Sequence, residues 1–222
     1  MYFNMSIFKS WKNYFKIKKK LNNSSNYILF YAENSSDWVY LNPIIKELKF
    51  YNEKIIKITS QYDDQVLSEL NTFYIGSETV LNILFRFIHV KAIVMTLTDL
   101  NNYFIKKSDK QVHYFYVFHS LVSTHRAYRE KAFNSYDTIL CTGEYQINEL
   151  RKNEEIYKLP KKNLERHGYG RLDKLINELK INKTEKKNNE YINVLISPTW
   201  GNGSIFGKTL NQLIDILLNS NF

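Results

Sequence analysis

Short apolar runs alternate with longer amphipathic stretches from residue 27 onward. Runs rich in Ile, Val, Tyr and Phe predict strands at 27–32, 55–59, 72–75, 92–96, 112–118 and 136–141. Apolar positions at helical spacing predict helices between them, ending at Phe50 and covering 65–70, 78–88 and 146–157. Because the strand runs are apolar throughout and alternate with helices, we predict an α/β fold with a mainly parallel sheet covered on both faces.

The first twenty residues carry a different pattern. Large apolar side chains recur there at a spacing that puts them on one face of a helix, at Ile7, Phe8, Trp11, Tyr14 and Phe15. Six lysines and no acidic residue lie in the same segment, which leaves only +3 of the net charge of +9 for the rest of the chain. Aromatic residues with lysines opposite are typical of a helix that lies on an anionic membrane surface, and a helix packed on its own domain is the alternative. Charge confined to one end argues against a nucleic-acid partner.

The composition divides the chain into three parts. Residues 1–21 form the basic segment, 26–180 a first domain, and 191–222 the start of a second domain after a polar linker. That second part contains one predicted strand at 192–196 and one helix at 209–218. A single strand–helix unit cannot close a core, so we expect the chain to lack most of its second domain.

Targeting and redox signals are few. No apolar run reaches the length of a secretory signal or of a membrane span, which needs about 20 residues. The single cysteine, Cys141, falls in an apolar run, where we expect a buried thiol in a reducing compartment.

A cluster of polar residues follows the predicted strand 112–118. His119 is a candidate general base there because imidazole titrates near neutral pH. The polar residues around it are candidate acceptor ligands: Ser120, Ser123, Thr124, His125, Arg126 and, after the strand 92–96, Asp99. In a parallel sheet, reacting groups gather at the carboxyl ends of strands. A loop that only caps a helix, with an inert His119, is the alternative.

Two further stretches could bind a phosphorylated donor. The first contains Gly168, Tyr169, Arg171 and Asp173 around a tight backbone path, and the second contains Ser197, Thr199, Gly201, Asn202 and Gly203. For the first, a purely structural turn is the alternative, and the second matches neither a Walker nor a dinucleotide-binding pattern. No histidines or cysteines show metal-ligand spacing, so neither a metal nor a cofactor is predicted.

In order, these stretches resemble the CDP-glycerol glycerophosphotransferase family of teichoic-acid and capsule synthesis. Four segments carry the resemblance: 118–120, 136–138 with Gly143, 168–173 and 197–200. Ser120 stands where family members commonly have Gly, and Gly170 where they have Pro. The resemblance implies the N-terminal, acceptor-side half of a GT-B architecture, in which two Rossmann-like domains face a cleft.

The resemblance also implies a reaction and partners. It implies transfer of glycerol phosphate from CDP-glycerol to a polyprenyl-linked or glycan acceptor, with His119 as base, on the cytoplasmic face of a bacterial membrane. A GT-B nucleotide-sugar glycosyltransferase and a non-catalytic membrane-surface module remain alternatives. Assays that compare CDP-glycerol with UDP- and GDP-sugars as donors would separate the glycosyltransferase from the glycerophosphotransferase. Vesicle binding without turnover would indicate the non-catalytic module.

Overall fold

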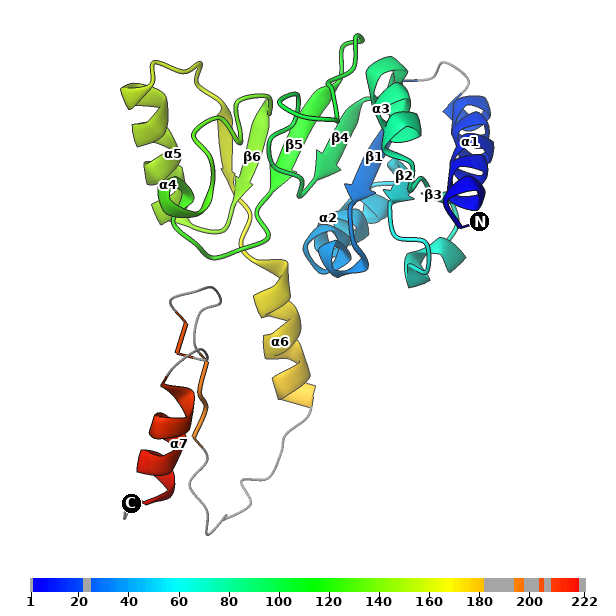
Figure 1. Cartoon of the computed structure of the whole chain (residues 1–222). Coiled ribbons are helices and arrows are strands. Elements are labelled where there is room, and N and C mark those ends of the chain that lie inside the picture. Colours follow the sequence, from blue (N-terminus) through cyan, green and yellow to red (C-terminus); the bar gives the residue numbers. More distant parts are fainter. Residues whose placement is uncertain (1, 22–24, 182–193, 198–203, 206–208, 220–222) are drawn as a thin grey trace. The chain divides into compact units, whose positions relative to one another are not determined.

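A computed structural model describes residues 2–21, 25–181, 194–197, 204–205 and 209–219, with side chains from residue 6 onward. The chain divides into two compact units, Met1–Glu178 and Leu179–Phe222. The first contains the sheet, and α7 lies in the second (Figure 1).

Seven parallel strands form the sheet in the order β3-β2-β1-β4-β5-β6-β7. The strands are β1 Tyr27–Ala32, β2 Lys54–Thr59, β3 Thr72–Tyr74, β4 Ala92–Met95, β5 His113–Val117, β6 Thr138–Cys141 and β7 Asn163–Arg166. This arrangement confirms the predicted α/β class with a Rossmann-like parallel sheet.

The helices follow the predicted pattern, and two helices occur that the prediction did not include: α4, which has four residues, and the longer α6. They are α1 Tyr2–Leu21, α2 Trp38–Phe50, α3 Glu78–Phe87, α4 Thr124–Ala127, α5 Glu144–Ile156, α6 Gly170–Ile181 and α7 Leu210–Leu218. Two short 3-10 helices cover Ser35–Asp37 and Gln65–Ser68, the second of them where a short α-helix was predicted.

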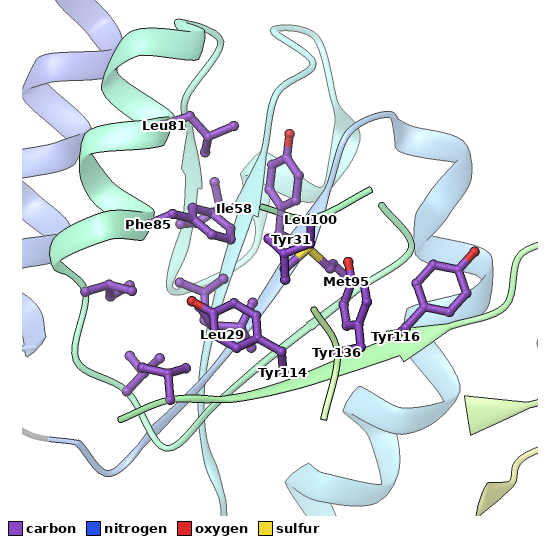
Figure 2. Packing of buried hydrophobic residues seen from close by; sticks show 14 of the residues in the cluster. Leu29, Tyr31, Ile58, Leu81, Phe85, Met95, Leu100, Tyr114, Tyr116 and Tyr136 are labelled. Atoms are coloured by element: carbon purple, nitrogen blue, oxygen red, sulfur yellow. The ribbon is translucent and has the colours of Figure 1, made fainter. Parts of the chain in front are cut away.

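Both faces of the sheet are buried, as the continuous apolar runs require. Successive residues of a strand point to opposite faces. Leu29 and Tyr31 of β1 therefore pack in one cluster with Phe85 of α3, which Figure 2 shows. Ile28 and Phe30 pack in a second cluster on the other face, with side chains of α2. Cys141 belongs to the first cluster and is fully buried, as predicted.

Helix α1 packs on its own domain, against α3 and β3. Its buried positions include Ser10, Ile17 and Leu21, whereas Phe8 and Phe15 are 74% and 63% exposed. Of the predicted apolar face, Trp11 and Tyr14 are partly buried and pack against the first cluster, so only part of that face points away from the domain. The membrane assignment stays a prediction.

Two strands differ from the prediction. A strand was predicted at 192–196. Residues 194–196 have no regular secondary structure, and residues 192 and 193 lie outside the described part of the chain. A lone apolar run needs a neighbouring strand to pair with, and the described part of this unit offers none. Edge strand β7 was missed because Leu164 is its one apolar residue.

Candidate functional site

The strand order creates a topological switch point between β1 and β4. From β1 the chain proceeds to β2 and β3 on one side and then returns to β4 on the other side of β1. In open parallel sheets, ligands bind beyond the carboxyl ends of the strands at such a point. The segments there are residues 33–37 after β1, 96–99 after β4 and 118–123 after β5.

His119 lies at this switch point. Its ring hydrogen-bonds to the backbone of Thr96, directly after β4, and experiences the charge of Asp37, which follows β1. Its Nδ1 atom is 3.3 Å from the hydroxyl of Tyr116. Burial lowers the pKa of His119 below its usual value of 6.5, against the opposing effects of Asp37 and Thr96. The imidazole is therefore neutral at neutral pH, the form that can accept a proton.

Three tyrosine rings surround the imidazole at similar distances. Tyr40 of α2, Tyr128 after α4 and Tyr116 of β5 have ring centroids 6.3, 6.3 and 6.4 Å from that of His119, all in edge-on geometry. They come from separate parts of the chain, so the orientation of the ring depends on the complete fold. Figure 2 shows Tyr116 at the end of the tyrosines that line β5.

A directed chain of hydrogen bonds ends on the backbone of His119. The Tyr169 hydroxyl donates its one proton to the His119 carbonyl at 3.1 Å. In its contact with the Tyr40 hydroxyl at 3.4 Å it is therefore the acceptor. Tyr40 in turn accepts from Arg171 at 3.5 Å. Burial, followed by the bond to Tyr40, raises the pKa of Tyr169 to about 12. The structure thus joins Tyr169 and Arg171, predicted as donor ligands, to His119.

The structure requires glycine on both sides of Tyr169, for a different reason at each position. Gly168 has φ +89°, in the left-handed region that side chains disfavour. A Cβ on Gly170 would lie 2.9 Å from the carbonyl oxygen of Val39 and 3.0 Å from Pro43. Proline at this position, as in the resembled family, would therefore collide with α2.

The other predicted residue of this stretch, Asp173, is exposed in the first turn of α6. Burial lowers the pKa of His167, and the charge of Asp173 opposes that shift. Asp173 therefore acts on His167, and no described hydrogen bond or ion pair joins it to His119.

Glu149 of α5 is the hydrogen-bond or charge partner of several predicted acceptor ligands. It accepts hydrogen bonds from the Ser123 hydroxyl at 2.8 Å and from the amide and hydroxyl of Thr124 at 2.5 and 2.7 Å. His125 is bound to Ser123 through Nδ1 at 2.9 Å and lies 3.7 Å from Glu149. This arrangement caps α4, so Ser123 and Thr124 have their donors engaged within the protein.

The other two predicted acceptor residues of this stretch, Ser120 and Arg126, have different surroundings. Ser120 hydrogen-bonds through its hydroxyl to that of Tyr128 at 2.5 Å, directly beside His119. Arg126 is exposed on α4, and its guanidinium makes no ion pair within the part of the chain that the structure describes. Arg126 is thus the cation of this group that is available to a phosphate or diphosphate.

The remaining predicted residues make no described contact with His119 or lie outside the described chain. Asp99 occupies a turn with φ 61°, tied through its amide to the Ala132 carbonyl at 2.9 Å, and no described contact links it to His119. Ser197 is an exposed residue of the second unit. The other candidates of that loop, Thr199, Gly201, Asn202 and Gly203, lie outside the described residues.

Sequence reasoning missed five residues that contact or act on His119: Asp37, Tyr40, Thr96, Tyr116 and Tyr128. Asp37 and Thr96 follow strands, which makes them candidates for a site, but only the strand order brings them to His119. The tyrosines carry no such signal, because an aromatic residue in an apolar pattern indicates core.

Exposed apolar side chains occur on the loops of this same sheet edge. Leu121 and Val122, next to the site, are 53% and 37% exposed, and Tyr103 and Phe104 in the loop after β4 are 52% and 68% exposed. Arg129 lies over the ring of Tyr103, 5.1 Å from its centroid. The loops that follow β4 and β5 thus carry exposed apolar side chains together with basic groups.

Together the fold and the site define a Rossmann-like α/β protein with a histidine at the switch point of its sheet. A scan against protein-family models found no match to this chain, and searches of curated proteins and of solved structures found none either. Among the described residues, no helix combines the length and the apolar character that crossing a membrane requires.

Proposed function

We propose that this chain is the acceptor-side part of a transferase that moves glycerol phosphate from CDP-glycerol to a hydroxyl group of a polyprenyl-linked or glycan acceptor. The observation that carries the proposal is the neutral imidazole of His119 at the switch point of the sheet. The choice of glycerol phosphate rests on the motif resemblance at 118–120 and 168–173.

In the proposed step, the acceptor hydroxyl gives its proton to His119 while its oxygen bonds to the phosphorus that carries glycerol. The bond from that phosphorus to the bridging oxygen breaks, and CMP leaves with the electron pair. The bond to the Thr96 backbone orients the ring, and the Arg171–Tyr40–Tyr169 chain holds its backbone. Positioning and charge, rather than covalent catalysis, supply the acceleration.

The environment of the site supports an amphiphilic acceptor. Leu121 and Val122 offer an apolar contact beside His119, and Arg126 offers a cation for a diphosphate group. A polyprenyl-diphosphate-linked sugar combines these two features with a free hydroxyl. An acceptor of this kind would place the protein at the cytoplasmic face of the membrane.

The proposal is tested by CMP release from CDP-glycerol in the presence of a polyprenyl-linked glycan in vesicles. We expect turnover by the chain combined with the donor-side domain that the proposed architecture requires, and a loss of about a hundredfold or more in His119→Ala of that enzyme. His89→Ala is the matched control, because His89 is exposed at the opposite end of the sheet and should leave turnover unchanged. Turnover of UDP- or GDP-sugars in place of CDP-glycerol would indicate the glycosyltransferase. Equal turnover by His119→Ala, or none by the unmodified combined enzyme with any donor, would overturn the assignment.

A further inference from the structure

Helix α1 presents an outer face that its own domain does not cover. Phe8, Lys12, Phe15, Lys16 and Lys19 recur at intervals of three and four residues, so they share one side of the helix. All five are exposed, and the two phenylalanines are 74% and 63% exposed. We call these five residues the outer face of α1.

The inner side of the helix is fastened to the domain through polar contacts. Asn13 donates to the Tyr74 carbonyl at 2.8 Å, and the Ser6 and Tyr74 hydroxyls lie 2.8 Å apart. The buried Ser10 hydroxyl accepts from the amides of Gly76 and Ser77 at 3.2 Å each. With Ile17 and Leu21 in the core, the helix is held in one orientation, and its outer face is fixed toward the surroundings.

The charges on the outer face are uncompensated. No acidic residue occurs among residues 1–20, and Lys12, Lys16 and Lys19 make no ion pair within the described part of the chain. A partner of this face therefore has to be negatively charged. It also has to accept two phenylalanine rings about two turns apart, which the charged phosphate backbone of a nucleic-acid duplex does not offer.

We propose that the outer face of α1 binds the surface of an anionic phospholipid bilayer. Phe8 and Phe15 enter the boundary between headgroups and acyl chains, and the lysines lie against the phosphate groups. Because α1 is fastened to β3 and α3, this contact holds the whole sheet domain in a fixed orientation on the membrane. The inference does not depend on the proposed transferase activity.

The test is co-sedimentation of the full chain with vesicles, without donor or acceptor. We expect binding to phosphatidylcholine mixed with phosphatidylglycerol and little binding to phosphatidylcholine alone. Replacing Lys12, Lys16 and Lys19 by Gln should weaken binding about a hundredfold, and Phe8→Ser with Phe15→Ser at least about tenfold. Phe50→Ser is the matched control, since Phe50 is 78% exposed at the end of α2.

The substituted side chains are exposed, so urea unfolding should show unchanged stability in every variant. His119→Ala should bind vesicles as the unmodified chain does, which separates this inference from the proposed activity. Equal vesicle binding by the phenylalanine variant and the unmodified chain would overturn the proposal. So would a dimer in light scattering that the phenylalanine variant abolishes, or tighter binding to an RNA probe than to anionic vesicles.

Discussion

The hydroxyl of Tyr169 donates a hydrogen bond of 3.1 Å to the backbone carbonyl of His119, a residue fifty positions earlier in the chain. The contact joins the segment before α6 to the end of β5. It therefore couples the two polar stretches that the sequence presented as separate candidates. The backbone of His119 is thus bound by the residue that precedes α6. Burial raises the pKa of the Tyr169 hydroxyl to about 12, so this donor stays protonated.

Tyr169→Phe tests this coupling. The substitution keeps the ring, which lies 5.4 Å from that of Tyr40, but removes the donor to the His119 carbonyl. We expect a loss of about 1 kcal/mol in the free energy of unfolding, measured by urea titration, because a half-buried carbonyl loses its partner. Tyr157→Phe is the control, since Tyr157 is 48% exposed at the end of α5. Equal stabilities of the two variants would show that the hydrogen bond does not hold this junction.

Gly170→Ala should be more damaging. The added Cβ would lie 2.9 Å from the Val39 carbonyl oxygen and 3.0 Å from Pro43, and neither group can rotate away. We expect a loss of about 1–3 kcal/mol in urea unfolding. At Gly143 an added Cβ would meet only the movable ring of Tyr145 at 3.4 Å, and the backbone is extended. A loss in Gly143→Ala as large as that in Gly170→Ala would contradict the steric account.

The central sheet was predictable because its strands are uninterrupted apolar runs. Tyr27–Ala32 is buried on both faces, which removes the need for polar alternation and leaves a strong signal. Asn163–Arg166 gives no such signal, because an edge strand exposes most of its side chains. The apolar run at 194–196 predicted a strand, but a strand also needs a neighbouring strand to pair with, and hydrophobicity does not indicate whether one is present.

The candidate site was predictable only in part. His119 could be found because a polar cluster follows a strand, and parallel sheets place such clusters at one edge. Its neighbours Thr96 and Asp37 depend on the strand order, which the hydrophobic pattern does not determine. Ser123 and Thr124 were read as ligands, since nothing in the sequence indicated that Glu149, 26 and 25 positions later, would take their hydrogen bonds.

Glu149→Ala tests the cap of α4. Its carboxylate accepts three hydrogen bonds from Ser123 and Thr124, all of which the variant removes. Bonds to a charged acceptor are strong, so we expect a loss of about 2 kcal/mol in urea unfolding at neutral pH. Glu155→Gln is the control, because Glu155 is 70% exposed and pairs only with Lys152, and it should change little.

The same cap predicts a pH dependence. Burial acts to raise the pKa of Glu149, but the hydrogen bonds from Thr124 and Ser123 and the charge of His125 outweigh it and lower that pKa below 4.5. The unfolded chain then binds a proton more readily than the folded one in acid. Stability from Glu149 should be complete above pH 4.5 and be lost as pH falls through the lowered pKa. A stability difference between Glu149→Ala and the unmodified chain that stays constant in acid would contradict this assignment.

His119 predicts a second pH effect, at a higher pH. Burial lowers its pKa below 6.5 in the folded protein, so between that lowered value and 6.5 the unfolded chain binds more protons. The stability that the neutral ring supports is therefore complete above pH 6.5 and falls as pH drops through the folded pKa. Urea unfolding across this range should show a shallower pH slope in His119→Gln than in the unmodified chain. An unchanged slope in His119→Gln would show that this imidazole does not stay neutral on folding.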